Sequence, residues 1–375
     1  MKRSKLALNG RFSGTLKPTG TQLVAFHLYD AIIRSDRDFD IVIYADPAFP
    51  GVAEWAGLDN TTLVPTAFSK WSRNRAQFWE QAVLPCAVRL RGCDLVHHPL
   101  GTAPRWALGT KTVLTIHDLN CYHNEDAFEP AFRNFLLATF IPALHRADHV
   151  VAISDFVLAD VRATLGIKAE KSSRIYNGLR PRPPSAVSVT EARRDHPVIF
   201  GVNLWQPHKN LSRLLEAFGQ VRPDFPGLEL HLAGRPQAQF KQQAELSASL
   251  DAPGVKVTGY LQEDELFDAY AGATVFCYPS LTEGFGLPIL EAMMVGTPVA
   301  TSDASCLPEI AGGAAILFDP KDPADIARAL RAALRETPAE RAVRVALGKK
   351  VAARFTWRQA ATEYIALFSR LLRPA

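Results

Sequence analysis

The chain of 375 residues is long enough for two domains of ordinary size, each with its own hydrophobic core. Its 47% hydrophobic and 21% charged residues exclude a disordered or fibrous protein and fit a globular enzyme. The net charge of +4 is too small to indicate nucleic-acid binding, so no nucleic acid is expected as a partner.

The compartment is predicted from what the sequence lacks. The N-terminal MKRSKLALNGRF has no apolar run of signal-peptide length, and no stretch approaches the roughly 20 apolar residues of a membrane span. The five scattered cysteines, none in a CxxC pair, fit buried thiols in a reducing compartment. We therefore expect a cytoplasmic protein, with any membrane contact peripheral.

The first half of the chain alternates between strand-like and helix-like segments. Helices are expected over roughly 21–34, 130–146 and 155–164. The expected strands are KLALNG, DIVIYAD, DLVHHP, TVLTIHD, HVVAIS and SRIYNG. Such alternation predicts a parallel, doubly wound sheet with helices on both faces.

Gly20 and His117 each have a functional interpretation beside a structural one. Gly20, in PTGTQ before the first helix, is either a turn that a ligand can approach closely or an ordinary loop glycine. His117 ends the strand in TIHDLN and should face the ligand-binding edge, unless it is a hydrogen-bonded core residue. Asp118 could orient His117 or act separately. His97 and His98 are left outside the site.

The segment 68–81, FSKWSRNRAQFWEQ, interleaves basic and aromatic residues. It could rest on an anionic membrane surface. Alternatively, it is a helix that packs its aromatic side chains inward and leaves a basic face in solvent.

Residues 179–196, rich in proline, serine and charge, predict a linker between the two domains. The second half repeats the α/β alternation, with Asp322 before Pro323 as a helix start. Its expected strands are PVIFGVN, LELHLAG, VKVTGY, TVFCYPS, PVATSD and AAILFD. A last helix near 355–372 is placed to cross back onto the first domain. We thus expect one domain of 1–178 plus 357–375 and another of 197–356, facing each other across a cleft.

The stretch CYPSLTEGFGLPILEAMMVGTPV (277–299) indicates the chemistry of the second domain. Gly284 and Gly286 let the backbone approach a ligand, and the helix start behind them favours an anion such as phosphate. Glu283 and Glu291 flank this position and could accept hydrogen bonds from sugar hydroxyls. Lys209, after the domain's first strand, would face the same edge and neutralise a diphosphate. The alternatives are a solvated helix face for the glutamates and an ordinary surface lysine.

These segments resemble those of retaining glycosyltransferase family 4. The resemblance is carried by PSLTEGFGLPILEAMMVGTPVATSDASCLPEIAGGAAILFDPKD, with two glutamates in E-x7-E spacing, and by QPHKNLSRLLEAF. PTGTQ, TIHDLN, ADHVVAISDFVLADV and SRIYNG are similar to family segments in the expected order. The resemblance implies a GT-B fold, two Rossmann-like domains with the donor held mainly by the second.

The resemblance also implies roles for individual residues. Glu283 would bind hydroxyls of the transferred sugar, Glu291 the ribose, Lys209 the diphosphate and Tyr260 the nucleobase. The implied donor-binding residues are Gly20, Asn203, Lys209, Arg235, Tyr260, Glu283, Gly284, Phe285, Gly286, Leu287 and Glu291. The implied catalytic residues are His117, Lys209 and Glu283, with His117 and Asp118 on the acceptor side.

The chain departs from the family's pattern at two positions. Many relatives have glycine where this chain has Asn203, and a basic residue where it has His208. The second change removes a charge beside Lys209, for which Arg235 could substitute.

The implied function is a retaining hexosyltransferase that uses a nucleotide diphosphate sugar in bacterial surface polysaccharide synthesis. The acceptor would be a glycan or lipid-linked glycan, and GDP-mannose is the first guess for the donor, with UDP- or dTDP-sugars open. No covalent nucleophile is expected, and no cofactor or metal, since the sequence has no DxD-like motif in a suitable loop and no Cys/His cluster with ligand spacing. A GT-B epimerase, a catalytically silent GT-B partner subunit and a dinucleotide oxidoreductase are the alternatives.

Overall fold

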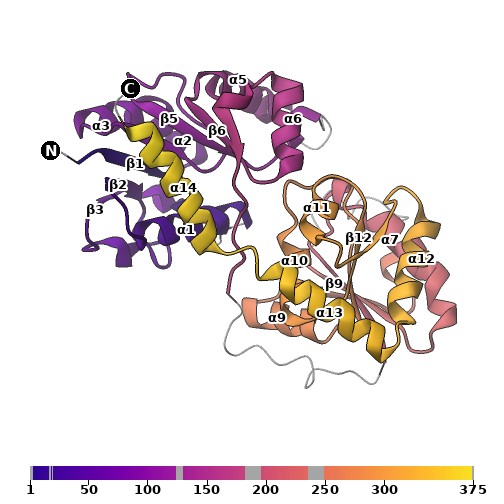
Figure 1. Ribbon diagram of the computed structural model, residues 1–375. Helices are drawn as coiled ribbons and strands as arrows, with labels where there is room; N and C mark the ends of the chain where they lie inside the picture. The colour runs from indigo at the N-terminus through magenta and orange to yellow at the C-terminus, as the bar shows by residue number, and fades with distance from the viewer. Residues whose placement is uncertain are drawn as a thin grey trace. The chain divides into compact units, whose positions relative to one another are not determined.

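The protein consists of two compact units, Met1–Arg180 with Phe355–Ala375, and Pro181–Arg354 (Figure 1). The computed structural model describes residues 3–16, 18, 20–123, 130–181, 196–234 and 249–373. Most of the expected linker, residues 182–195, lies outside the described residues. Each unit is an α/β structure around a parallel sheet, as the alternation in the sequence predicted.

The first unit contains a seven-stranded parallel sheet in the order β3-β2-β1-β4-β5-β6-β7. Its strands are β1 (Lys5–Gly10), β2 (Asp40–Ala45), β3 (Thr61–Pro65), β4 (Leu95–His98), β5 (Lys111–Ile116), β6 (His149–Ala152) and β7 (Ser172–Arg174). Six of these strands overlap the predicted runs, although β5 begins one residue before its run and β7 shares only Ser173 and Arg174 with SRIYNG. The sequence analysis missed β3, an edge strand that is partly exposed and ends in proline, so that it carries no apolar run.

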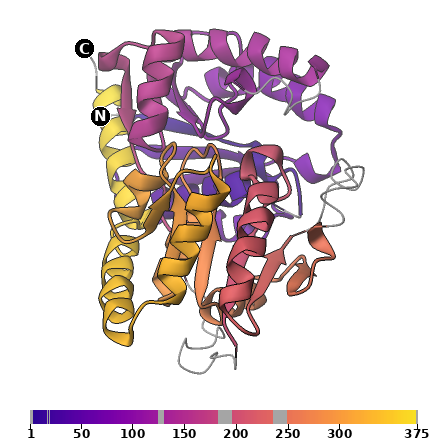
Figure 2. The same ribbon diagram turned by 90° about the vertical axis from the view of Figure 1, so that its right-hand side faces the viewer.

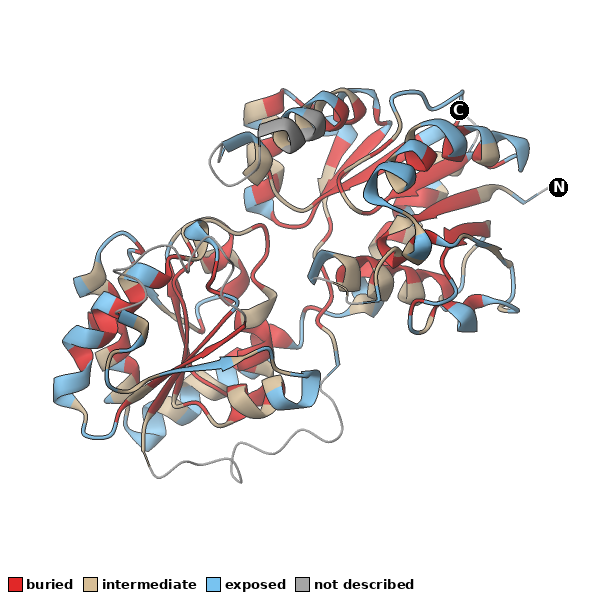
Figure 3. Cartoon of the chain, turned by 180° about the vertical axis from the view of Figure 1, so that it is seen from behind, coloured by how far each residue is buried: buried red, intermediate tan, exposed pale blue. Residues whose placement is uncertain are grey.

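Helices cover both faces of this sheet. They are α1 (Gly20–Ile33), α2 (Arg73–Phe78), α3 (Leu84–Leu90), α4 (Asn120–His123), α5 (Pro130–Arg146), α6 (Asp155–Leu165) and α14 (Trp357–Leu372). Shorter helical turns are η1 (Arg11–Ser13), η2 (Val52–Trp55), η3 (Phe68–Lys70), η6 (Ala169–Lys171) and the π-helix η4 (Trp79–Val83). The strands form the buried centre of the unit (Figure 3).

The C-terminal helix α14 belongs to the first unit, where it lies beside α1 (Figure 1). The Tyr364 hydroxyl lies 2.7 Å from Thr115 Oγ1, and that atom also lies 2.8 Å from Nε2 of buried His97. The first residue of α14, Trp357, lies so close to position 178 that only glycine fits there. A Cβ at this position would lie 2.3 Å from the backbone nitrogen of Trp357. His97 is therefore part of the packing between sheet and helix, in keeping with its omission from the site.

The second unit contains a six-stranded parallel sheet in the order β10-β9-β8-β11-β12-β13. Its strands are β8 (Val198–Val202), β9 (Glu229–Ala233), β10 (Val255–Gly259), β11 (Val275–Tyr278), β12 (Val299–Ser302) and β13 (Ile316–Phe318), all within predicted runs. The chain builds outward from β8 to β10 and then returns to the other side of β8 with β11. The two directions diverge between β8 and β11, which is where open sheets of this kind bind ligands.

The helices of the second unit follow from apolar periodicity and caps. They are α7 (Leu211–Val221), α9 (Glu263–Ala271), α10 (Leu287–Val295), α11 (Leu307–Ala311), α12 (Pro323–Leu334) and α13 (Pro338–Ala352), with the turns η7 (Pro207–Lys209) and η8 (Arg222–Asp224). Helices α7 and α12 pack against one another (Figure 2). The predicted start at Asp322 is confirmed, since its carboxylate accepts the N–H of Ala324 at 2.8 Å. No helix among the described residues combines the length and apolarity that crossing a bilayer requires.

Candidate functional site

The divergence point between β8 and β11 brings together two of the charged residues that the sequence singled out. Lys209 ends η7, which follows β8, and Glu283 follows β11. Neighbouring parallel strands end at the same edge of a sheet, so the loops behind them meet. Lys209 Nζ lies 2.6 Å from Glu283 Oε1. The sequence predicted that both residues face this edge, but not that they form an ion pair.

Tyr278, the last residue of β11, completes the environment of the ammonium group. Its hydroxyl accepts a hydrogen bond from Lys209 Nζ at 2.9 Å. Burial alone would lower the pKa of Lys209, but Tyr278 and Glu283 outweigh it and raise the pKa, so the ammonium stays charged. Burial, with the charge of Glu283, also raises the pKa of Tyr278, which therefore stays a neutral phenol. An ammonium has three N–H donors, so a third can serve an anion.

Helix α10 begins beside this ion pair. Gly286 precedes its first residue with a left-handed φ of +95°, and a Cβ there would lie 2.7 Å from Leu307 Cδ2. Pro288 stands in the first turn and has no N–H, which suits a position where helices leave N–H groups without intrahelical partners. The helix start at Gly286 and Leu287 thus offers positive dipole and backbone donors next to Lys209.

The backbone of Glu283 is held at both of its polar groups by the loop after β12. Ser305 Oγ accepts the Glu283 N–H at 3.1 Å, and the thiol of buried Cys306 donates to the Glu283 carbonyl at 3.2 Å. Ser305 itself has a φ of +56°, which non-glycine residues rarely adopt. The loop therefore fixes the direction in which the Glu283 side chain leaves the backbone.

Buried Asn210 joins three of the loops at this edge. Its side-chain amide donates to the carbonyls of Pro279 at 3.0 Å and Pro320 at 2.6 Å, while the backbone N–H of Leu281 donates to the His208 carbonyl at 2.7 Å. These bonds tie the loop after β8 to those after β11 and β13. Lys209 and Glu283 are thus held on rigid backbone.

Glu291 occupies the second turn of α10, as predicted, and is buried. The hydroxyl of buried Tyr270, in α9, donates to Glu291 Oε2 at 3.0 Å. The tyrosine fixes one carboxylate oxygen and satisfies its need for a donor. The sequence analysis missed this partner, as it missed Tyr278, Asn210, Ser305 and Cys306.

The remaining predicted donor-binding residues of the second unit lie around the same edge or outside the described part of the chain. Asn203 has a φ of +54°, a left-handed backbone that glycine adopts freely and asparagine tolerates. Tyr260 directly follows β10 and is largely exposed. Gly284 and Phe285 are buried between Glu283 and α10. Arg235 lies outside the described residues.

Three predicted site residues, His117, Asp118 and Gly20, belong to the first unit. His117 follows β5, and its Nε2 donates to the Pro99 carbonyl at 2.7 Å. Burial lowers the pKa of His117, so the imidazole is neutral and Nδ1 is left as an acceptor. Asp118 Oδ1 accepts the N–H of Asn120 at the start of α4, so the orienting contact of His117 is Pro99. A Cβ at Gly20 would meet nothing within 4 Å, which leaves open space there.

The segment 68–81 divides its aromatic side chains between interior and surface. Phe68 and Trp79 are buried, and Trp71 packs against the same core. Arg75 stacks over the Trp71 ring at 4.8 Å, and Phe78 is exposed. The inward-packing interpretation therefore describes most of this segment.

Within the described ranges, no three His, Cys, Asp or Glu side chains come together in a way that could hold a metal ion.

Two family descriptions match consecutive parts of the chain. "Glycosyltransferase Family 4" matches residues 18–182, and "Glycosyl transferases group 1" matches residues 196–336. The chain belongs to glycosyltransferase family 4. This confirms the resemblance found in the sequence.

The serotype-specific mannosyltransferase WbdA of Escherichia coli is 28% identical to this family 4 chain over 278 residues, which covers 70% of the chain and 34% of WbdA. The O-antigen chain mannosyltransferase B of Escherichia coli is 26% identical over 279 residues, 70% of this chain and 71% of that protein. The chain thus spans about a third of the length of WbdA.

A solved structure supports the fold. The sucrose-phosphate synthase of Thermosynechococcus elongatus superimposes with a TM-score of 0.74 at 22% identity, covering 98% of this chain and 99% of that protein. Together with the two parallel-sheet units, this likeness confirms the expected GT-B fold.

Proposed function

We propose that this family 4 chain is a retaining hexosyltransferase that transfers a sugar from a nucleoside diphosphate sugar to a glycan or lipid-linked glycan. The observation that carries the proposal is the Lys209–Glu283 pair of 2.6 Å beside the glycine-lined start of α10. A diphosphate needs a fixed cation and backbone donors, and a sugar needs a carboxylate acceptor next to them. This edge of the second sheet offers all three.

The donor we propose is GDP-mannose. Its support is the naming of similar proteins as mannosyltransferases, two of them for serotype or O-antigen sugars. In this assignment the diphosphate contacts Lys209 and the backbone of Gly286 and Leu287, Glu283 accepts from mannose hydroxyls, and Glu291 from the ribose. The role of the chain would be in bacterial surface polysaccharide synthesis on the cytoplasmic side of the membrane.

The proposed reaction places the acceptor on the same face of the sugar as the departing diphosphate. The acceptor oxygen bonds to the anomeric carbon while that carbon's bond to the diphosphate oxygen breaks. The acceptor's proton passes to the departing oxygen, so configuration is retained without a covalent intermediate. Neither glutamate is placed as a nucleophile, since Glu283 is paired with Lys209 and Glu291 is buried against Tyr270.

The side chains would contribute position and charge. Lys209 and the first turn of α10 stabilise the negative charge that develops on the diphosphate, which needs no metal ion in this scheme. Neutral His117, held by Pro99, could accept a hydrogen bond at Nδ1 from the sugar or the acceptor hydroxyl. In this scheme the open space at Gly20 would admit the donor.

The test begins with a thermal-shift screen of GDP, UDP, dTDP, ADP and their sugars. We expect GDP and GDP-mannose to raise the melting temperature most. The purified protein is then incubated with GDP-mannose and mannose-terminated oligosaccharides, with and without EDTA, and the linkage formed is assigned by NMR. We expect an α-linked product that EDTA does not suppress.

Each part of the proposal can fail separately. Stabilisation by a UDP- or dTDP-sugar alone would replace the donor but keep the site. A β-linked product would overturn retention, and loss of turnover in EDTA would overturn metal independence. No response to any nucleotide would overturn the enzyme and favour a silent partner subunit.

A further inference from the structure

The positive charge of this chain is concentrated in one stretch of the first unit. Residues 70–111 contain seven lysines and arginines against two acidic residues, whereas the whole chain carries a net charge of only +4. The rest of the protein is therefore close to neutral. One of the two acidic residues, Glu80, is buried and lies 3.1 Å from Arg11 Nε.

The same stretch exposes an unusual share of apolar side chains. Of the thirteen large apolar side chains that the described residues expose, five lie between positions 78 and 108. They are Phe78, Val83, Leu90, Trp106 and Leu108. Leu90 is 86% exposed and Trp106 is 70% exposed, so neither contributes to the core. Clustered exposed apolar groups of this kind mark interaction surfaces.

Hydrogen bonds join the two segments that carry these side chains. The Gln81 side chain donates to the Ala103 carbonyl at 3.0 Å and accepts the Arg105 N–H at 3.1 Å. Further along, Arg89 Nη1 donates to the Leu108 carbonyl at 2.8 Å. The loop 104–109 is thereby fastened along η4 and α3.

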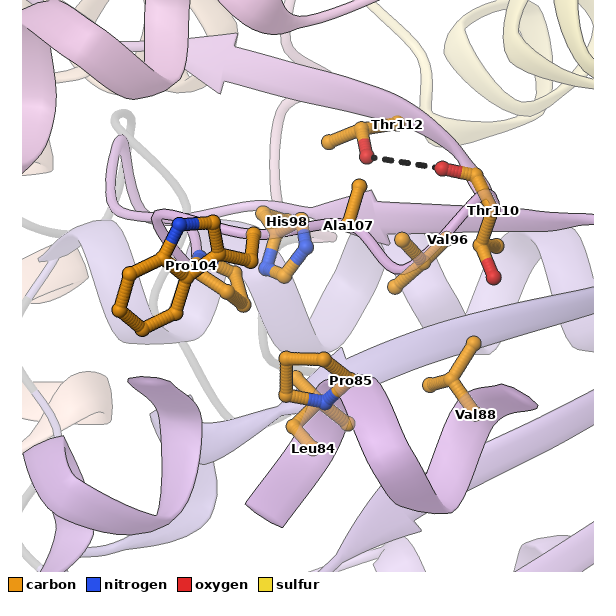
Figure 4. Close-up of a pocket in the computed structure, with 10 residues that line it drawn as sticks. Leu84, Pro85, Val88, Val96, His98, Pro104, Ala107, Thr110 and Thr112 are labelled. Atoms are coloured by element: carbon orange, nitrogen blue, oxygen red, sulfur yellow. Dashed lines mark hydrogen bonds between the residues drawn. The ribbon is translucent and has the colours of Figure 1, made fainter. Parts of the chain in front are cut away.

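An apolar pocket lies between this loop and α3 (Figure 4). Leu84, Pro85 and Val88 of α3 face Pro104 and Ala107 of the loop across it (Figure 4). The helix and the loop therefore pack against one another, which places their exposed side chains on neighbouring parts of the surface. We call residues 73–91 and 104–109 together the basic-apolar surface.

We propose that the basic-apolar surface binds an anionic lipid bilayer, with Leu90, Trp106 and Leu108 entering the headgroup region. Exposed Arg89, Arg91 and Arg105 lie next to these three side chains in the sequence. Guanidinium groups bind lipid phosphates through paired hydrogen bonds, and indole rings favour the membrane interface. Arginines alone could also bind the phosphates of a nucleic acid. Exposed aliphatic side chains such as Leu90 would contribute nothing to that contact, so they favour a bilayer.

This inference differs from the sequence-based interpretation of segment 68–81. There, Phe68, Trp71 and Trp79 pack inward, so that only Phe78 of its large aromatics is exposed. The apolar groups that can reach a bilayer lie mainly beyond that segment, on α3 and the following loop. The inference goes beyond the proposed function, because it concerns binding to a surface and not sugar transfer.

The test is co-sedimentation of the full chain with phosphatidylcholine vesicles that contain or lack phosphatidylglycerol. We expect binding to the anionic vesicles that weakens as salt is raised, and little binding to the neutral ones. The variant Leu90→Asn/Trp106→Gln should bind at least about tenfold more weakly, since it removes two apolar anchors. Arg91→Gln/Arg105→Gln should weaken binding at low salt and little at high salt.

Matched controls separate the surface from general effects. Val343→Asn on α13 changes a side chain that is 71% exposed, and Arg354→Gln removes an exposed arginine of the second unit. Both should bind vesicles like the wild type. Equal binding by the Leu90→Asn/Trp106→Gln variant and the wild type would overturn the proposal. So would absence of vesicle binding, or binding to duplex DNA or RNA in place of vesicles. The assay needs no nucleotide sugar, so its failure would leave the proposed transfer reaction untouched.

Discussion

Replacing Lys209 with methionine keeps the length of the side chain and removes its charge. In the wild type the ammonium pairs with Glu283 at 2.6 Å and is held by Tyr278 at 2.9 Å. A hydrogen bond to a charged group contributes about 1.5–3 kcal/mol, so loss of the diphosphate contact should weaken nucleotide binding roughly 10- to 150-fold.

The expected change in melting temperature follows from mass action. Nucleotide at about 100 times its dissociation constant stabilises the folded protein by ~2.7 kcal/mol, or roughly 5–11 °C for a unit of this size. If Lys209→Met raises the dissociation constant about 30-fold, the same nucleotide concentration contributes only ~0.9 kcal/mol, roughly 2–4 °C. The assay is a thermal shift with the nucleotide that stabilises the wild type most.

The readout is the ligand-induced shift within each variant. Removing Lys209 also leaves Glu283 without its partner, which lowers the melting temperature of the ligand-free protein. Lys256→Met is the matched control, since Lys256 pairs with Glu229 at 2.7 Å in the same unit but is largely exposed. A full ligand-induced shift in Lys209→Met, or an equal loss in Lys256→Met, would refute the reasoning.

Three further predictions concern the surroundings of the site and the first unit. Tyr278→Phe removes the hydroxyl that holds Lys209, and calorimetry should show about 5- to 10-fold weaker binding of the nucleoside diphosphate but unchanged binding of the monophosphate; equal losses would contradict this. Ser305→Gly fits the backbone φ of +56°, so the melting temperature should stay unchanged. The variant removes the hydroxyl that accepts the Glu283 N–H, so sugar transfer should slow severalfold. Unchanged turnover would exclude a positioning role for Ser305. Burial, aided by Arg11, lowers the pKa of His98 to about 3, so only the unfolded chain takes up this proton between pH 6.5 and 3. Stability should therefore fall on acidification by up to about 1.4 kcal/mol per pH unit from this group, and His98→Gln should flatten the slope of denaturant-derived stability against pH; an unchanged slope would show that His98 does not titrate in this way.

Sequence reasoning found the charged residues of the site because their position follows from topology. Lys209 lies in the connection after β8 and Glu283 in the connection after β11. These two strands are neighbours in a parallel sheet, so both residues come to the same edge. The buried strands and the cap at Asp322 were also predictable, because apolar runs and cap residues are local signals.

The residues that hold those charges could not be found in the same way. Tyr278 and Tyr270 stand within apolar runs, where a tyrosine is also an ordinary core residue. Only the structure shows that the Tyr278 hydroxyl lies 2.9 Å from Lys209 and the Tyr270 hydroxyl 3.0 Å from Glu291, which gives both tyrosines a role in the site. Ser305 contacts Glu283 from the loop after β12, and no local sequence pattern predicts a contact between two separate loops.

The sequence also could not show which aromatic side chains of segment 68–81 point into the core. The π-helix η4 follows α2 directly and shifts the helical repeat by a residue. Adjacent residues then differ sharply, with Phe78 exposed and Trp79 buried. A 3.6-residue pattern carried on from α2 would therefore misplace the side chains that follow the π-helix.

A crystal structure with the nucleoside diphosphate that stabilises the protein most would test the central claim directly. The account predicts diphosphate oxygens within about 3 Å of Lys209 Nζ and of the backbone N–H of Leu287, with the ribose at Glu291. A nucleotide bound away from the carboxyl ends of β8 and β11, with the Lys209–Glu283 pair untouched, would contradict it.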